Sequence, residues 1–153
     1  MSQLDARLAE LGLEVPATSK PVAAYLPAVT SGNLVYTSGQ LPMVDGALPA
    51  TGKVGASVSP EDAQRFARQC VLNSLAAART AIGSLDRITR VVKVVGFVAS
   101  DPSFTGQPAV INGASELLQE IFGEAGQHAR SAVGVAVLPL DAPVEIEFVF
   151  EFA

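Results

Sequence analysis

The order of hydrophobic and polar residues along the chain predicts a mixture of strands and amphipathic helices. Residues 144–152 alternate strictly between apolar and mostly acidic side chains, which predicts a strand with one buried face. Residues 59–82 and 108–122 instead repeat apolar side chains at helical spacing. Ser59 followed by Pro60 marks the start of the first helix, because serine caps free N–H groups and proline fits the first turn.

Shorter segments near the N-terminus give weaker signals. Residues 22–29 and 34–40 are predicted to form a β-hairpin, because Thr30-Ser31-Gly32-Asn33 between them has typical turn chemistry. Residues 47–54 follow a second turn and are weakly extended. Residues 2–11 carry leucines on one face, which predicts a short leader helix.

Two further segments, 88–99 and 131–138, are apolar on both faces, as strands covered on both sides are. The resulting order of a leader helix, a hairpin, a helix, a strand, a helix and two strands predicts an α+β fold. Two helices in a chain of this size cover only one face of a sheet. We therefore expect another copy of the chain to cover the second face.

The composition agrees with that expectation and narrows the possible functions. A mean hydropathy of +0.37 with 16% charged residues is high for a small domain that must wet its whole surface. The formal net charge is −5, from 15 acidic and 10 basic residues. Because a nucleic-acid surface normally needs a basic stripe, we expect no binding to nucleic acid.

The length of 153 residues predicts a single domain, 1–153, of which residues 1–20 form the leader helix and an arm. No stretch approaches the roughly 18 apolar residues of a membrane span. The first ten residues mix charged side chains with leucine and lack the apolar core of a secretory signal. We therefore expect a cytoplasmic protein with no membrane association.

Several classes of active site lack their residues here. The chain has one cysteine, Cys70, and one histidine, His128, which argues against a disulfide framework and against a His/Cys zinc site. The glycine-rich phosphate loops, the zinc-protease helix motif and the hydrolase serine elbow are missing as well.

Arg130 is the sharpest candidate for chemistry. It stands at the mouth of an apolar strand, where an unpaired guanidinium is costly and needs an anion. One interpretation is a structural salt bridge to Glu145 or Glu147 of the last strand. The other is a fork that binds the carboxylate of a substrate through two N–H groups. The two glutamates are likewise either solvated or paired, or one of them handles a proton or a water.

Other candidates carry weaker signals. The run Thr37-Ser38-Gly39-Gln40 ends a predicted strand and is either a turn or a set of backbone groups for a ligand. Tyr25, in the predicted first strand, is typical of a core or an interface. Cys70 lies on the apolar face of the long helix, which is typical of an inert thiol. His128 alone indicates little.

These polar positions together resemble a known family. The carriers are the runs V-Y-T-S-G-Q-L-P from Val35, V-V-K-V-V-G-F-V from Val91, H-A-R-S from His128, L-P from Leu138 and V-E-I-E from Val144, together with Asn73. In this order they resemble the Rid superfamily, the YjgF-like reactive-intermediate deaminases also labelled endoribonuclease L-PSP. The resemblance covers about residues 22–150 and is greatest to the longer branch of the family.

The resemblance implies a chorismate-mutase-like mixed sheet with two helices on one face. It implies a homotrimer with clefts between subunits, and no metal or organic cofactor. The implied activity is hydrolysis of reactive enamines and imines, such as 2-aminoacrylate, to 2-keto acids and ammonia. Arg130 then holds the carboxylate of the imino acid and Glu145 positions or activates the water, while the substrate-binding positions are Tyr25, Ser38, Gly39, Asn112 and Ala132.

Two alternatives stay open from the sequence. The fold could serve a non-catalytic binder of small carboxylates or an interaction partner of a metabolic enzyme, with ribonuclease a distant third. Ala132 stands where the deaminase pattern often has cysteine, and Leu26-Pro27-Ala28 replaces a polar segment that contains glycine. These departures concern the identity of the substrate.

Overall fold

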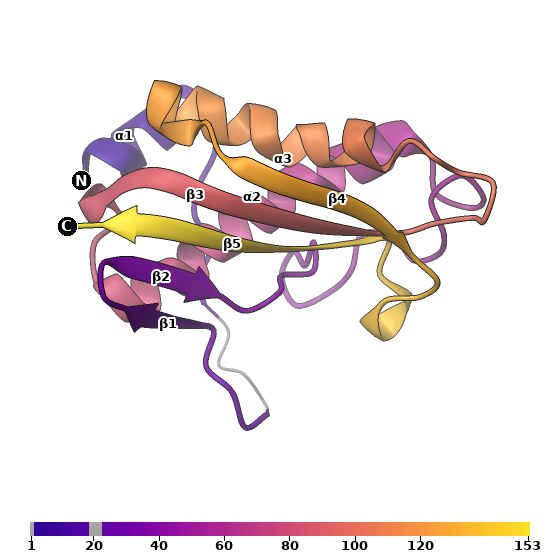
Figure 1. The fold of residues 1–153 in the computed structure, drawn as a ribbon, viewed down its shortest axis with the longest axis horizontal. Helices are drawn as coiled ribbons and strands as arrows, with labels where there is room; N and C mark the ends of the chain where they lie inside the picture. Colours follow the sequence, from indigo (N-terminus) through magenta and orange to yellow (C-terminus); the bar gives the residue numbers. More distant parts are fainter. Residues whose placement is uncertain (1, 19–22) are drawn as a thin grey trace.

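One mixed sheet organises the computed structural model, which describes residues 2–18 and 23–153. Within those residues the sheet has five strands in the order β1-β2-β5-β3-β4 (Figure 1). The strands are β1 (Ala28–Ser31), β2 (Leu34–Thr37), β3 (Ile88–Ala99), β4 (Ala129–Val135) and β5 (Val144–Phe152). The pair β3–β4 is parallel and the other pairs are antiparallel, so β4 forms one edge of the sheet.

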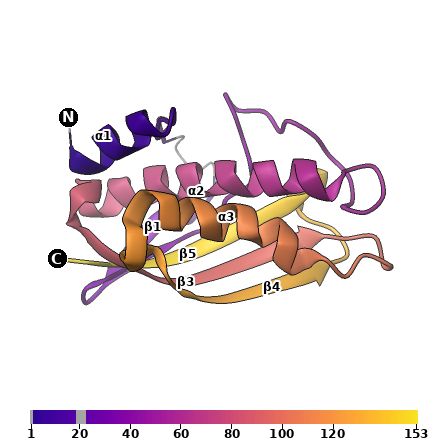
Figure 2. The ribbon, with the colours of Figure 1, turned by 90° about the horizontal axis from the view of Figure 1, so that it is seen from above.

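Two long helices cover one face of this sheet, as the sequence predicts. Helix α2 (Pro60–Ile82) and helix α3 (Gln107–Phe122) lie side by side above the strands in Figure 2. The leader helix α1 (Gln3–Glu10) lies beyond α2 in the same view. Short 3₁₀ turns complete the fold: η1 (Leu85–Arg87), η2 (Gly123–Gly126) and η3 (Pro139–Asp141). The predicted α+β architecture is confirmed.

The predicted helix starts are confirmed by their hydrogen bonds. The Ser59 side chain accepts a hydrogen bond from the backbone N–H of Asp62 at 3.1 Å, and Ser2 does the same for Asp5 at 3.0 Å. Helix α2 ends at Gly83, whose φ of 83° is available to glycine at little cost.

The core lies between the two helices and the sheet. The apolar residues of β5 alternate into it, and the rings of Phe148 and Phe150 stack with centroids 5.8 Å apart. Gly96 lets α3 approach β3 closely, because a Cβ at this position would lie 2.6 Å from Cγ1 of Ile111. This close contact fixes the height of α3 above the sheet.

The predicted strands near the N-terminus and the predicted strand 131–138 have other bounds in the structure, and the second strand of the hairpin ends at Thr37 rather than at residue 40. Strand β1 begins at Ala28, after Pro27, which has no N–H to donate; Tyr25 therefore lies in the loop 23–27 and not in a strand. Val22 lies outside the described residues. Strand β4 ends at Val135, because its register partner Ala99 is the last residue of β3. Residues 47–54 form no strand and only take part in isolated bridges.

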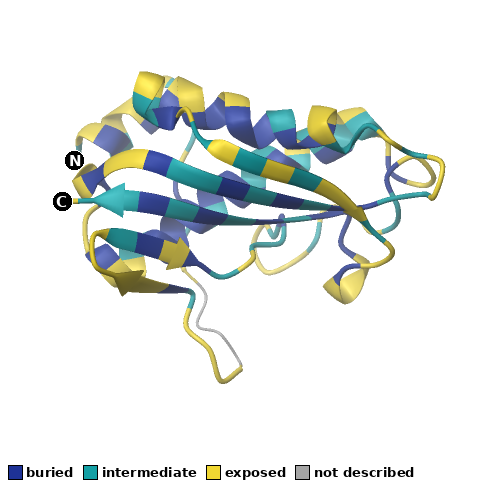
Figure 3. Ribbon diagram, in the orientation of Figure 1, coloured by how far each residue is buried: buried dark blue, intermediate teal, exposed yellow. Residues whose placement is uncertain are grey.

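The second face of the sheet is open in the single chain. Along the central strands, Figure 3 shows buried residues alternating with exposed or intermediate ones. The residues of the second face come from every strand: Val29, Tyr36, Lys93, Val95, Phe97, Ser131, Val133, Glu145, Glu147 and Val149. We call this surface the open face. In the described residues, no helix is long and apolar enough to cross a membrane.

Candidate active site

Arg130 lies on the helix side of β4 and is held there by α3. Its Nη1 donates hydrogen bonds to Oδ1 of Asn112 at 2.7 Å and to Oγ of Ser115 at 3.1 Å. Its Nη2 donates to the carbonyl of Pro108 at 3.4 Å. Asn112 and Ser115 are three residues apart on α3 and so share one face of the helix. The guanidinium is therefore oriented by neutral partners.

This orientation leaves one edge of the Arg130 guanidinium available. A guanidinium has five N–H groups, and three of those of Arg130 are used by the bonds just described. Among the described residues Nε has no hydrogen-bond partner, and Nε and Nη2 share the edge that binds carboxylates through two parallel bonds. The side chain is half-buried, so the positive charge is neither hidden nor fully solvated. We call Arg130, Asn112 and Ala132 the arginine group.

The interpretation of Arg130 as a partner of Glu145 or Glu147 within the chain is wrong. Strand β4 pairs with β3 and not with β5, and Arg130 stands opposite Val94, which is buried in the core. Glu145 stands opposite Phe97, three residues further along β3. Because side chains alternate between faces, an offset of three places Arg130 and Glu145 on opposite faces of the sheet.

Glu145 is the centre of a second set of residues, at the edge of the open face. Burial raises the pKa of its carboxyl above the ordinary glutamate value, and the negative charge of Glu147 raises it further. A Cβ on Gly39 would collide with this carboxylate. Glycine at position 39 therefore allows the Glu145 side chain to lie against the backbone. We call Glu145, Gly39 and Ser38 the glutamate group.

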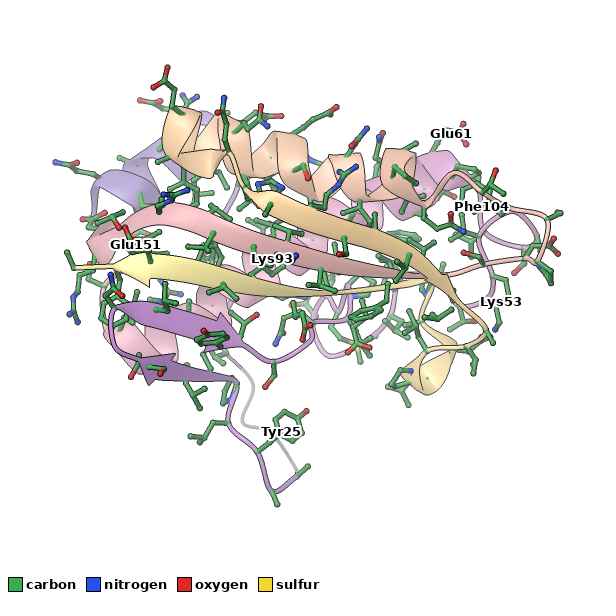
Figure 4. All side chains as sticks on the ribbon, in the orientation of Figure 1. Tyr25, Lys53, Glu61, Lys93, Phe104 and Glu151 are labelled. Carbon is green, nitrogen blue, oxygen red and sulfur yellow. The ribbon has the colours of Figure 1, made fainter. Side chains whose placement is uncertain are left out.

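Ser38 connects the glutamate group to the loop that carries Tyr25. Its backbone N–H donates to the carbonyl of Pro27 at 2.8 Å, and its Oγ donates to the carbonyl of Leu26 at 2.6 Å. Tyr25 is 59% exposed, and Figure 4 shows it on the loop that extends away from the sheet. Its side chain thus lies away from the body of its own chain.

The segment that follows Gly39 is tied to helix α2. Nδ2 of Asn73 donates to the carbonyls of Leu41 at 2.9 Å and of Met43 at 3.1 Å. Gln40 also pairs with Ile146 through two backbone hydrogen bonds, which places this segment beside β5. Asn73 therefore sets the position of the backbone around the glutamate group.

The sequence did not predict two members of the site, Ser115 and His128. Ser115 is buried, and its Oγ lies 2.8 Å from Nε2 of His128. Nδ1 of His128 lies 2.6 Å from the carbonyl of Gly126. Two signals could have pointed to them: Ser115 follows Asn112 by three residues in a helix, and His128 precedes Arg130 by two residues at the start of a strand.

Other reactive side chains contribute little to a site. Cys70 is buried in the core, and this burial raises the pKa of its thiol well above the usual value, which fits the prediction of an inert thiol. In the described parts of the chain, 2–18 and 23–153, His, Cys, Asp and Glu form no group of three suited to a metal ion.

Comparison with known proteins decides the family. The sequence model of the "YjgF/chorismate_mutase-like" family matches residues 5–153. The chain belongs to the YjgF family. This protein is similar to protein TCP17 of Trypanosoma cruzi, with 46% identity over 95% of this chain and 92% of that protein. A solved structure from Agrobacterium tumefaciens, of a protein of unknown function, has 48% identity and a TM-score of 0.91, over 98% of this chain and 92% of the other.

Another relative of this YjgF-family protein is named for an enzymatic activity. The 2-iminobutanoate/2-iminopropanoate deaminase of Dermatophagoides farinae is 33% identical over 88% of this chain and 91% of that protein. The comparisons therefore confirm membership of the Rid superfamily and the chorismate-mutase-like fold that the sequence motifs indicate.

Proposed function

We propose that this protein hydrolyses the imines and enamines of small 2-amino acids to 2-keto acids and ammonia, at a site that two copies of the chain build together. The observation that carries the proposal is the guanidinium of Arg130, which neutral partners orient and whose Nε and one N–H of Nη2 have no hydrogen-bond partner among the described residues. The Nε–Nη2 edge fits a small carboxylate. The name of the deaminase relative specifies a carboxylate of that kind, with an imine on the adjacent carbon.

The reaction depends more on the placement of the substrate and the water than on strong acid or base catalysis. In the protonated imine the carbon is already electrophilic, and an enamine reaches this state by taking up a proton on carbon. Water adds to the carbon and gives up a proton to a base. The base returns this proton to the nitrogen, the C–N bond breaks while the new hydroxyl loses its proton, and ammonia leaves, so that a keto group remains. Arg130 fixes the carboxylate and with it the carbon that the water attacks.

Glu145 supplies the base in this scheme. Its carboxylate accepts the proton of the attacking water and stabilises the positive charge on the imine nitrogen. The raised pKa of Glu145 makes its carboxylate a stronger base than that of an ordinary glutamate. Ser38 and Gly39 hold the carboxylate in place, and Ala132 offers backbone groups of the edge strand.

The site requires two copies because the arginine group and the glutamate group lie on opposite faces of one sheet. Copies arranged around an axis would bring the β4 edge of one to the open face of the next, which is a head-to-tail contact that can close into a ring. The open face is apolar enough for this, with Val133 44% exposed and Val29 49% exposed. We propose a homotrimer, with Tyr25 of one copy reaching the cleft of its neighbour.

The test measures release of ammonia from enzymatically generated 2-iminopropanoate, above the spontaneous rate. The wild type should accelerate release. Arg130→Ala should reduce kcat/KM about 10- to 100-fold, which corresponds to loss of charge-assisted hydrogen bonds of about 1.5–3 kcal/mol. Arg90→Ala removes an exposed arginine of β3 and serves as the matched control. Equal rates for the wild type and Arg130→Ala would contradict the role of Arg130, and no acceleration by the wild type would contradict the activity.

A further inference from the structure

We propose that Ser115 and His128 are positioning residues for Arg130: a hydrogen-bond relay from the carbonyl of Gly126 through His128 and Ser115 fixes the plane of the guanidinium that receives the ligand. The proposal rests on the function proposed above, because it assigns a task only if Arg130 binds a carboxylate. It adds two residues that do not touch the ligand. They act by reducing the number of orientations open to the arginine.

The direction of each hydrogen bond in the relay follows from the chemistry of the groups. The carbonyl of Gly126 only accepts, so Nδ1 of His128, 2.6 Å away, carries the proton. In the neutral ring Nε2 is then an acceptor, and the hydroxyl of Ser115 donates to it across 2.8 Å. With its hydrogen committed, Oγ of Ser115 turns its lone pairs toward the Nη1 group of Arg130 at 3.1 Å. A single arrangement of protons satisfies every group.

The surroundings favour the neutral ring that this arrangement requires. Burial lowers the pKa of His128, and the positive charge of Arg130 on β4 lowers it further, whereas the hydrogen bond to Gly126 acts in the opposite direction. The carboxylates nearest in sequence on the other two packed elements, Glu116 of α3 and Glu124 of η2, are exposed. A protonated ring would donate from both nitrogens, and Ser115 would then have to turn its hydrogen away from Nε2.

Three hydrogen bonds hold the guanidinium of Arg130. The bonds from Nη1 to Asn112 at 2.7 Å and from Nη2 to the carbonyl of Pro108 at 3.4 Å leave its plane some freedom to tilt, because the second bond is long. The bond from Nη1 to Ser115 at 3.1 Å restricts this tilt and keeps the Nε–Nη2 edge in one orientation. The turn that supplies the Gly126 carbonyl is itself fixed, because a side chain at Gly126 would collide with the Leu118 carbonyl of α3. The relay is thus built on rigid parts of the fold.

Calorimetric titration of the full-length protein with pyruvate tests the relay apart from catalysis. Ser115→Ala and His128→Phe should each weaken pyruvate binding about 3- to 30-fold, while Arg130→Ala should abolish it. His128→Phe keeps a ring of similar shape and removes both nitrogens. Ser115→Thr keeps the hydroxyl and should bind nearly as the wild type does. Thermal unfolding of each variant shows whether it is folded, and Ser115→Ala removes only one oxygen.

Two further readouts separate positioning from a structural role. In turnover, Ser115→Ala should raise KM and leave kcat nearly unchanged, because Arg130 holds the carboxylate equally in the ground state and the transition state. In the Glu145→Gln background, which removes the titrating carboxylate proposed to face the ligand, pyruvate affinity should fall as the pH drops through the lowered pKa of His128. The same series with His128→Phe should be flat.

The outcomes are distinguishable. If the wild type does not bind pyruvate, or if Arg130→Ala binds it equally well, the proposed function fails and the relay loses its purpose. If Arg130→Ala abolishes binding while Ser115→Ala and His128→Phe keep the affinity of the wild type, the proposed function stands and the relay is overturned. A loss of affinity in Ser115→Ala that Ser115→Thr restores supports the relay.

Discussion

At the scale of single residues, Glu145 is held in surroundings that oppose its charge. It is half-buried and stands beside Glu147 on the same strand, and both effects raise the pKa of its carboxyl. The folded chain therefore holds the proton of this group more tightly than the unfolded chain does. The free energy of unfolding decreases as the pH rises through the ordinary glutamate pKa toward the raised one. At pH values above the ordinary glutamate pKa, ionisation of Glu145 therefore costs stability, which is typical of a residue kept for its chemistry.

This argument predicts the behaviour of Glu145→Gln. The variant should have a higher Tm than the wild type at pH 7, and the difference should vanish at pH values below the ordinary glutamate pKa, where both side chains are neutral. The variant should also lose deaminase activity at every pH. Thermal unfolding between pH 3 and 8, with exposed Glu14→Gln as the control, provides the measurement. A Tm that falls at pH 7 would show that the carboxylate stabilises the fold.

At the scale of elements, the sequence predicted those parts whose signals are local. Strand β5 and helices α2 and α3 appear nearly where the pattern placed them, because alternation, caps and glycine stops lie within each segment. The segment from Gly39 to Ser59 could not be predicted, because long-range bonds such as those from Asn73 to Leu41 and Met43 decide its course.

The residues of the candidate site also divide into those that the sequence could predict and those that it could not. An arginine at the mouth of an apolar strand stands out in the sequence, and the motifs around Arg130 and Glu145 add to that signal. Ser115 and His128 do not stand out, because their contact joins a helix to the start of a strand and exists only in the fold. The sequence also did not reveal that Arg130 and Glu145 lie on opposite faces of the sheet, because this placement follows from the strand order β5-β3-β4.

Asn73 provides a prediction at this scale. Asn73→Ala leaves the carbonyls of Leu41 and Met43 without their side-chain donor and should lower the free energy of unfolding by about 1–3 kcal/mol. In a domain of this size that change corresponds to a fall in Tm of about 2–10 °C. Gln69→Ala removes the neighbouring bond to Oδ1 of Asn73 and leaves both carbonyls paired, so it should cost much less. Equal losses for the two variants would show that Asn73 does not anchor this segment.

At the scale of the whole molecule, one copy cannot complete the proposed site. The arginine group and the glutamate group are separated by one intervening strand, by three positions along the strands, and by the sheet itself. A small imino acid bound to Arg130 therefore cannot reach the Glu145 of its own chain. A neighbouring copy can supply that carboxylate, and its body would also cover part of the open face.

Mixing two inactive variants tests whether two copies share the site. Arg130→Ala chains keep Glu145, and Glu145→Gln chains keep Arg130, so a ring that contains both variants has an intact site wherever the two intact residues meet. In trimers assembled at random from equal amounts, about three quarters contain both variants, and each of these has one intact site in three. Joint unfolding and reassembly should therefore restore about one quarter of wild-type deaminase activity, whereas mixing without unfolding should restore little. A jointly reassembled mixture that stays inactive, although a similar treatment of wild-type chains recovers activity, would place Arg130 and Glu145 of one chain in the same site.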